Sequence, residues 1–405
     1  MNRQNIRSER AHYMCPNMHF GIRFSLHSVF EPQKIREILE LLAAAHPFLR
    51  ALVQREDGTD NLFYNVTDES KIQCSSLADE TKVEQAWGCI AISEWNVFVE
   101  GLLKVFSCPT QEGTTVLFAA HHLLTDGRGL LELVCEFTDC LADGKTPKFA
   151  EEHLIASMDD LPKESELAFV SRVLVDRAGK RWRKENHPVS YAQYLKFSVF
   201  FGETHPVDYR FDKMDESSLT ALSGQCHAAG ISINDWLMAQ LYLRTGTKRI
   251  IIAADIRDRL REYRSGALGN YSTAMGIICR TRTTEPMEKA KDVHMLVRKA
   301  LSNQKSKMLV LACYLQMEPT LLDAAAISAL DGFDSKAARF VGSKMFGFSK
   351  PTAYSITNLG KFENQHMDFA EFIPPASPAA SATIGVLTLN GVMRTVTSVY
   401  CEKKD

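Results

Sequence analysis

The stretch His121-His122-Leu123-Leu124-Thr125-Asp126-Gly127 places two adjacent histidines shortly before an Asp-Gly pair. Residues 114–120, which precede it, are mostly apolar and predict a strand that leads directly into the histidines. After Gly127, apolar residues recur at helical spacing until about residues 143–144, which predicts a helix. The stretch therefore lies at a strand-to-helix turn, where the backbone can hold one imidazole rigidly.

These residue types suit proton transfer during acyl transfer. Attack of a hydroxyl or an amine on a thioester needs a base that removes a proton from the incoming group. A neutral imidazole, with an ordinary pKa of about 6.5, suits this work at cellular pH. His122 is the candidate general base. Asp126 can lock the turn by local bonding, and Gly127 permits a backbone conformation that other residues resist.

Other interpretations of the two histidines remain open on spacing alone. An adjacent pair of histidines often arises by chance on a surface or in a core. A metal site is the weaker alternative, because neighbouring side chains on a strand point to opposite faces. His121 and His122 would then not share one ion, and no metal is predicted.

Length, charge and cysteine usage limit the class of protein. A chain of 405 residues exceeds the size at which one hydrophobic core keeps growing, which predicts two lobes. The net charge of -2 speaks against a nucleic-acid partner. The polar N-terminus lacks the apolar region of a signal peptide, and no apolar run is long enough for a membrane span. Ten scattered cysteines without a CxxC pair predict reduced thiols in a cytoplasmic protein.

The pattern along the chain predicts an α+β protein. Strands are expected at residues 19–29, 51–54, 61–65, 101–108, 194–201, 207–211 and 249–255, and helices at residues 32–45, 215–229, 233–244 and over most of 285–346. Asn390-Gly391 predicts a type I′ hairpin within residues 384–400. Strands and helices do not alternate strictly, which favours α+β over a doubly wound sheet. The expected division is an N-terminal lobe at 1–165, a connection at 166–188 and a C-terminal lobe at 189–405.

Five segments in a fixed order carry a resemblance to a known superfamily. Residues 121–127 resemble the HHxxxDG motif shared by chloramphenicol acetyltransferase-like enzymes. These include the condensation domains of peptide synthetases, plant BAHD acyltransferases, wax-ester synthases and the polyketide-associated acyltransferases of mycobacteria. The other four segments are HPFLR at 46–50, GISINDWL at 230–237, DIRDRL at 255–260 with GNY at 269–271, and YSITNLG at 354–360. Together they extend the resemblance over nearly the whole chain.

The resemblance implies a fold and a set of site residues. The fold would be two similar lobes, each a mixed sheet with flanking helices, with an active-site tunnel between them. His122 would be the catalytic base. His121, Asp126 and Gly127 would be structural, with Arg257 as the expected partner of Asp126 and Arg259 as the runner-up. Asn270, Ser355, Thr357 and Asn358 would line the tunnel, although Asn270 could equally end a strand and Asn358 cap a turn.

The implied activity is an acyltransferase of secondary metabolism. The donor would be an acyl-CoA or an acyl group on a phosphopantetheinyl carrier protein, and the acceptor a small alcohol or amine. No tightly bound cofactor is expected, and the protein is expected to be a monomer. A DFGWG-like segment of the plant branch is missing, as are attached adenylation and carrier domains. A free-standing polyketide-associated or alcohol O-acyltransferase is therefore the closest type, with an amide-forming condensation enzyme or a non-catalytic carrier-recruiting module as alternatives.

Overall fold

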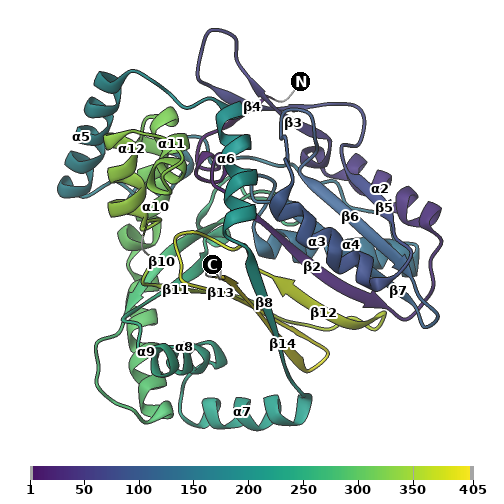
Figure 1. Cartoon of the computed structure of the whole chain (residues 1–405). Helices are drawn as coiled ribbons and strands as arrows, with labels where there is room; N and C mark the ends of the chain where they lie inside the picture. The colour runs from purple at the N-terminus through teal and green to yellow at the C-terminus, as the bar shows by residue number, and fades with distance from the viewer. Residues whose placement is uncertain (1–2, 350, 402–405) are drawn as a thin grey trace.

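The computed structural model describes residues 3–349 and 351–401, which form two lobes, each built around a central sheet (Figure 1). Each of these sheets contains both parallel and antiparallel neighbours and is flanked by helices. The predicted α+β class with a mixed sheet in each lobe is confirmed. The tunnel between the lobes stays a prediction.

The N-terminal lobe contains a five-stranded sheet with the strand order β12-β2-β7-β6-β5. Its strands are β2 (His19–Leu26), β5 (Gln73–Ser76), β6 (Leu103–Pro109), β7 (Thr114–His121) and β12 (Met367–Ile373). Only β5 and β6 are parallel. β7 is central and buried along its whole length, so the strand that carries the histidine motif is held between β2 and β6.

Helices cover both faces of this sheet. α2 (Pro32–Ala45) and α4 (Gly127–Asp143) lie on one face, and α3 (Glu80–Ile92) lies on the other. Phe24 of β2 packs against Phe137 of α4, whereas Gly21 of the same strand lies against Trp87 of α3. Residues three apart on a strand point to opposite faces, which places the two helices on opposite sides. The bounds predicted for α2 are confirmed.

A small antiparallel sheet with the order β1-β4-β3 extends the N-terminal lobe. It consists of β1 (Gln4–Ile6), β3 (Ala51–Arg55) and β4 (Leu62–Val66). The strand pair predicted on either side of Asp57-Gly58 is confirmed.

The C-terminal lobe contains a six-stranded sheet with the order β10-β9-β11-β13-β14-β8. Its strands are β8 (Val207–Met214), β9 (Arg249–Asp255), β10 (Ser272–Ile278), β11 (Tyr354–Phe362), β13 (Thr383–Leu389) and β14 (Val392–Tyr400). α7 (Glu216–Ala228), α8 (Ile233–Thr245) and α9 (Pro286–Ser302) share a separate hydrophobic core with this sheet. The φ angles of 48° at Asn390 and 79° at Gly391 confirm the predicted type I′ turn.

Segments from the second half of the chain enter the N-terminal lobe. β12 pairs with β2, although it lies within the range predicted for the C-terminal lobe. The hydrophobic cluster that contains the core of the N-terminal lobe also includes residues of five helices, α5 (Phe169–Glu185), α6 (Tyr191–Thr204), α10 (Gln304–Gln316), α11 (Pro319–Ala329) and α12 (Lys336–Phe340). The two lobes are therefore interleaved along the sequence, and the predicted boundaries at residues 165 and 188 stay a prediction.

The strand predicted at residues 194–201 is wrong, because these residues belong to α6. The N-terminus of this helix carries a capping box. Ser190 accepts a hydrogen bond from the Gln193 backbone N–H, and the Gln193 side chain accepts one from the Ser190 backbone N–H. The Ser-x-x-Gln spacing was the signal that would have identified the helix.

Two further features are the state of the cysteines and the character of the helices. All ten cysteines are free thiols, and six of them are buried, as expected for small side chains packed in a core. Within residues 3–349 and 351–401, no helix combines the length and the apolar character that a membrane crossing requires.

Candidate active site

The HHxxxDG motif forms the turn between β7 and α4, at the end of a buried strand. His121 is the last residue of β7 and pairs with His19 of β2. The backbone N–H of His122 donates to the Met18 carbonyl at 2.9 Å. Asp126 is the N-cap of α4, and its carboxylate accepts a hydrogen bond from a backbone N–H of the first helical turn at 3.0 Å. The turn is therefore fixed at both ends.

His121 is a buried, neutral ring. Its Nδ1 accepts a hydrogen bond from the Leu123 backbone N–H at 3.2 Å, so the proton of the neutral ring is on Nε2. Burial lowers the pKa of His121 to about 3, with smaller contributions from His19 and His122. At neutral pH this ring contributes packing and not proton transfer.

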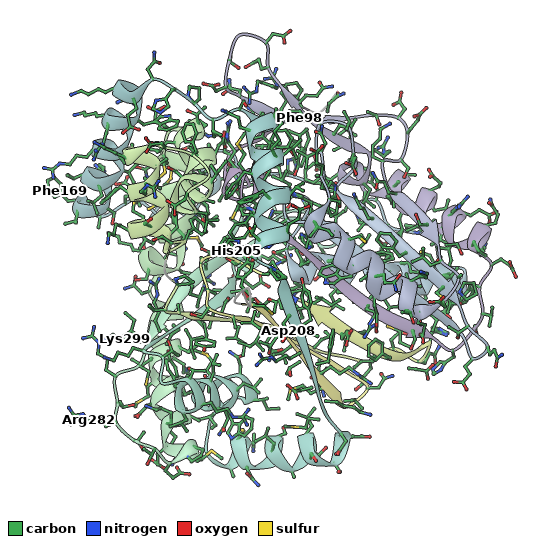
Figure 2. All side chains as sticks on the ribbon, in the orientation of Figure 1. Phe98, Phe169, His205, Asp208, Arg282 and Lys299 are labelled. Carbon is green, nitrogen blue, oxygen red and sulfur yellow. The ribbon has the colours of Figure 1, made fainter. Side chains whose placement is uncertain are left out.

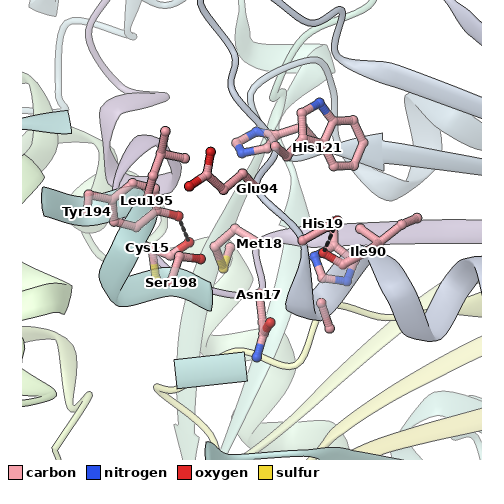
Figure 3. A pocket seen from close by; sticks show the side chains of 13 residues that line it. Cys15, Asn17, Met18, His19, Ile90, Glu94, His121, Tyr194, Leu195 and Ser198 are labelled. Atoms are coloured by element: carbon pink, nitrogen blue, oxygen red, sulfur yellow. Dashed lines mark hydrogen bonds between the residues drawn. The ribbon is translucent and has the colours of Figure 1, made fainter. Parts of the chain in front are cut away.

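A small cavity lies beside His121 (Figure 3). Its lining includes His19 and Tyr194, whose hydroxyl donates to the Cys15 carbonyl at 3.0 Å. Its volume of about 30 Å³ has room for a water molecule but not for a substrate.

Asn270, in the loop just before β10, makes two hydrogen bonds to His122. Its Nδ2 donates to the His122 backbone carbonyl at 2.8 Å, and its Oδ1 lies 2.8 Å from His122 Nδ1. A carbonyl oxygen only accepts, so the first bond fixes the orientation of the amide and turns Oδ1 toward the ring. Because Oδ1 also only accepts, Nδ1 must carry the proton. The lone pair of the neutral ring is therefore on Nε2, as a general base requires.

The surroundings of His122 keep its ring uncharged at neutral pH. Burial lowers the pKa of His122 below its ordinary value of 6.5, while the Asp126 carboxylate and the bond to Asn270 offset part of this effect. The unprotonated form therefore dominates at pH 7. A base in this form can accept a proton from an acceptor group without first losing one.

Asp126 pairs with Arg257, as the resemblance implied. Arg257 Nη2 donates to Asp126 Oδ1 at 2.8 Å, and Nη1 donates to Oδ2 at 3.1 Å. The Tyr271 backbone N–H also donates to Oδ2, at 2.9 Å. Both side chains are buried, with 7% of Arg257 and 4% of Asp126 exposed. The pair joins the motif in one lobe to the segment after β9 in the other, whereas Arg259 lies exposed beside Asp258.

The surroundings of Gly127 favour a small residue, whereas its backbone conformation does not require glycine. Its φ angle is outside the left-handed region, so the conformational role predicted for it is wrong. A Cβ at this position would lie 3.0 Å from Leu359 Cδ2 and 3.2 Å from Phe372 Cζ. The neighbouring Gly129 is more constrained, since its Cβ would lie 2.1 Å from Thr125 Oγ1. The two glycines therefore allow the start of α4 to approach its neighbours closely.

Two of the predicted tunnel residues, Ser355 and Thr357, lie half-buried on β11. Ile356 between them is part of the hydrophobic core of the C-terminal lobe. Because side chains alternate along a strand, Ser355 and Thr357 point to the opposite face of the sheet. Leu359, further along β11, lies next to Gly127. β11 therefore passes the start of α4 close to the histidine motif.

Asn358 is exposed and bonds locally. Its Oδ1 accepts a hydrogen bond from the Gly360 backbone N–H at 2.8 Å, and Gly360 has a φ angle of 88°. The pairing of β11 with β13 also shifts register between Asn358 and Lys361. These features are those of a turn cap, which is one of the two interpretations that the sequence left open.

His46 of the HPFLR segment lies between two carboxylates. Its Nε2 lies 2.7 Å from Glu136, and its Nδ1 lies 3.2 Å from Glu152. Glu152 also accepts hydrogen bonds from a backbone N–H of the HPFLR segment at 2.6 Å and from that of Leu268 at 3.2 Å. Leu268 belongs to the loop that carries Asn270. Glu152 therefore connects the HPFLR segment to the loop that orients His122.

The charge of His46 predicts a pH-dependent stability. Burial alone would lower its pKa, but the hydrogen bonds to Glu136 and Glu152 outweigh burial and raise the pKa from 6.5 to about 9. The native protein then binds this proton more tightly than the unfolded chain does. We expect a contribution to the free energy of unfolding on the order of 3 kcal/mol, complete below pH 6.5 and lost as the pH rises to about 9.

Urea unfolding of the wild type and of His46→Gln at several pH values measures this contribution. The difference between the two proteins should shrink across the interval from about pH 6.5 to about pH 9. A difference that stays constant over this interval would show that His46 is not charged in the native protein.

Three residues around His122 were not predicted from the sequence. The ring of His12 stacks on that of His122, and the ring of Phe20 meets it edge-on. Thr125 donates through Oγ1 to the Gly269 carbonyl at 3.2 Å, beside Asn270. Thr125 lies inside the motif, but its hydroxyl has no partner nearby in the sequence. No spacing rule relates residue 12 to residue 122, because only folding brings them together.

No family model and no curated protein matches the sequence. Solved structures do match it over almost its whole length. The TRI3 trichothecene 15-O-acetyltransferase from Fusarium sporotrichioides is 13% identical, with 98% of this chain and 91% of that chain covered and a TM-score of 0.63. The condensation domain of the Monacolin K polyketide synthase MokA is 12% identical, with coverages of 99% and 93% and a TM-score of 0.61. The epimerization domain from the third module of tyrocidine synthetase B is 14% identical, with coverages of 97% and 88% and a TM-score of 0.57.

Identities this low show the fold alone. The chain shares the two-lobed fold of these three structures, which is the fold that the resemblance of its five segments implied. The three similar structures bear the names of different activities, so the reaction of this chain must be argued from its own site.

Proposed function

We propose that this chain, with its chloramphenicol acetyltransferase-like fold, transfers an acyl group from a thioester to a hydroxyl or amine acceptor. The similarity to an acetyltransferase and to a condensation domain supports acyl transfer or condensation in general. The observation that carries the finer proposal is the pair of hydrogen bonds between Asn270 and His122, which leaves the lone pair on Nε2. An imidazole in that tautomer, with a pKa below its ordinary value, is suited to act as a general base.

The proposed reaction is a direct transfer without an acyl-enzyme. His122 Nε2 accepts the proton of the acceptor while the acceptor oxygen or nitrogen forms a bond to the thioester carbonyl carbon. The carbon–sulfur bond of the tetrahedral intermediate then breaks, and the proton passes from Nε2 to the leaving thiolate. Asn270 stabilises the imidazolium, because its Oδ1 continues to accept a hydrogen bond from the His122 Nδ1–H group.

Polar groups on β11 are the proposed surroundings of the reacting carbonyl. Thr357 and Ser355 share the sheet face that α4 approaches, and the Thr357 hydroxyl is the candidate donor to the developing oxyanion. Asp126 and Arg257 hold the turn and take no part in proton transfer. Asn358, which caps a turn, contributes to the shape of this segment.

Removal of the Asn270 amide tests the tautomer argument. We expect Asn270→Leu to lower kcat by about 10- to 100-fold with a smaller change in KM, because the ring loses both its orientation and its preferred tautomer. Steady-state kinetics and thermal unfolding should be measured on the same preparation. A folded variant with an unchanged kcat would exclude Asn270 as the group that orients the base.

The proposed reaction requires a thioester donor, and two kinds of donor fit it. An acyl-CoA and an acyl carrier protein present the same phosphopantetheine thioester, and both carry negative charge. Helix α5 offers a cationic surface for either. Its exposed cationic side chains are Arg172, Arg177, Lys180, Arg181, Arg183 and Lys184. Arg172, Arg181 and Arg183 form ion pairs with Glu166, Glu185 and Glu318, respectively. Phe169 at the start of α5 adds an apolar side chain to this surface, with 79% of the residue exposed. Figure 2 labels its position.

Charge reversal on α5 tests a role in docking a carrier protein. We expect the triple change Arg177→Glu, Lys180→Glu and Lys184→Glu to raise KM for a carrier-bound donor by about 10-fold at low salt. KM for a short acyl thioester without a carrier should not change. The matched control reverses three exposed cations of α9, Lys291, Arg298 and Lys299. Equal effects of the two triple variants would show that the surface of α5 is not specific.

The activity itself is tested with a mixed pool of substrates. Purified protein is incubated with acyl-CoAs and acylated carrier proteins of several chain lengths, together with panels of alcohols and amines. Intact mass spectrometry detects the ester or amide product, and release of free thiol gives the rate. Product that depends on both substrates supports the proposal. Tight binding to an acylated carrier without turnover on any acceptor would instead identify a carrier-recruiting module.

A further inference from the structure

The imidazole of His12 lies face-on to the imidazole of the proposed base. The two ring centroids are 4.2 Å apart, and the ring planes differ by 8°. On another side of the base, the ring of Phe20 meets it edge-on, at 4.9 Å and 62°. Together with Asn270 at Nδ1, these contacts restrict the rotation of the His122 ring. Nε2 is the ring nitrogen that none of these three contacts uses.

A short helix, α1 (Arg10–Tyr13), holds His12 in place. Arg10 is almost fully buried and forms a bidentate pair with Asp323 of α11, with one contact of 2.9 Å between Arg10 Nε and Asp323 Oδ1. Tyr13 stacks on Tyr191 of α6, with a centroid distance of 5.0 Å and an angle of 5°. One turn of helix is marginal by itself, so these tertiary contacts are what make it rigid. These contacts of Arg10 and Tyr13 fix the position of His12 between them.

His12 is uncharged at neutral pH, and among the described residues its buried Nδ1 takes part in no hydrogen bond that would explain its position. Burial, followed by the neighbouring His122 and His121, lowers the pKa of His12 well below 6.5. Two imidazolium rings at this distance would repel each other strongly. A neutral aromatic face, in contrast, attracts a cation that lies over it.

We propose that His12 is a positioning residue for His122: its neutral ring fixes the plane of the base and supports the imidazolium that forms during the reaction. The proposal rests on the proposed acyl transfer, in which His122 carries the positive charge transiently. During that step the proton resides on His122 Nε2, while His12 neither gains nor loses one. The titratable groups that act on the pair are His121 and Asp126 of the motif, with His19 and Lys104 acting through His121.

Two substitutions separate the ring of His12 from its nitrogen atoms. His12→Phe keeps a flat aromatic face of similar width, and His12→Ala removes it. We expect His12→Phe to retain kcat within about 3-fold, and His12→Ala to lose about 10- to 100-fold in kcat with little change in KM. Thermal unfolding of both variants shows whether each is folded. Equal losses in two folded variants would overturn the proposal.

A double-mutant cycle distinguishes positioning from a general structural effect. If His12 acts only through His122, His12→Ala should not lower the residual turnover of the His122→Ala variant by more than about 2-fold. A merely structural role, or direct contact of His12 with substrate, would lower it further. A further loss comparable to that in the wild-type background would overturn the proposal.

A third measurement does not require turnover and keeps the two proposals distinguishable. NMR titration of histidine-labelled protein follows the ring signals of His122 in the wild type and in both variants. We expect titration below pH 6.5 in the wild type and in His12→Phe, and titration at a still lower pH in His12→Ala, which lacks the aromatic face that stabilises the imidazolium. Identical titration in all three proteins would overturn the role of His12. The expected titration with no acyl transfer on any substrate would instead contradict the proposed function alone.

Discussion

Replacement of His122 by alanine is expected to lower kcat for acyl transfer by about 10²- to 10⁴-fold. The loss follows from the position of the ring, because Asn270 fixes the tautomer in which Nε2 is free to accept a proton. Donor binding and stability should change little, since the half-buried ring makes no charged pair in the native protein. Rates of product formation, donor dissociation constants and thermal unfolding together separate these effects.

The matched control is an exposed histidine that directly follows a strand of the same sheet. His27, which follows β2 and has 49% of its side chain exposed, can be changed to alanine without affecting a buried ring. We expect wild-type kinetics for His27→Ala. Turnover by His122→Ala close to that of the wild type would remove His122 from the mechanism, whereas loss of folding would leave the NMR titration as the test of its protonation.

The pH dependence of the same reaction has a defined direction. Only the unprotonated ring is active, so kcat/KM should be constant above neutral pH and fall on the acid side. Burial lowers the pKa of His122, which places the fall below pH 6.5. A fall centred above pH 6.5 would show that a different group controls the rate.

Loss of Arg257 is expected to have the largest effect on stability. Arg257→Ala leaves the Asp126 carboxylate buried without its bidentate partner, at 4% exposure of the side chain. Removal of one member of a buried pair typically costs about 3–5 kcal/mol. Lysine should rescue only part of this loss, because it cannot make two parallel hydrogen bonds to a carboxylate. Urea unfolding measures the loss of stability directly.

Activity should fall together with stability in these variants. Asp126 caps α4 and accepts a hydrogen bond from Tyr271, next to Asn270, so its displacement moves the residue that orients the base. Asp126→Asn should therefore lower kcat through geometry, because an amide nitrogen would face the Arg257 guanidinium. Arg259→Ala, at an exposed neighbouring arginine, is the control and should change stability by no more than about 0.5 kcal/mol. An Arg257→Ala variant as stable as this control would contradict a structural role for the pair.

Local features of the fold were predictable because their causes are close together in the sequence. The bounds of α2 follow from Pro32 at its start and Pro47 after its end. The hairpin turn at residues 390–391 follows from the ease with which Asn and Gly adopt positive φ angles. The assignment of α6 as a strand failed for a local reason as well, because the capping box formed by Ser190 and Gln193 was overlooked.

The roles of the glycines depended on tertiary contacts. Gly127 was expected to allow an unusual backbone conformation. Instead, the space for a side chain at this position is limited by Leu359 and Phe372, which approach from other strands. The same holds for the pairing of β12 with β2, which joins strands from opposite ends of the chain. Hydrophobic patterning specifies that a strand is buried, but it does not specify which neighbour covers it.

The sequence by itself determined the class of fold and the motif at the β7–α4 turn, and the family resemblance pointed to Arg257 as the Asp126 partner, with Arg259 as the runner-up. These depend on residue type, on spacing and on segments whose order is diagnostic. Only the tertiary structure decided the state of His122. The tautomer of His122 is set by Asn270, its pKa by burial, and the plane of its ring by His12. All three result from residues of distant segments meeting in a space with little water, where hydrogen bonds and charges act strongly.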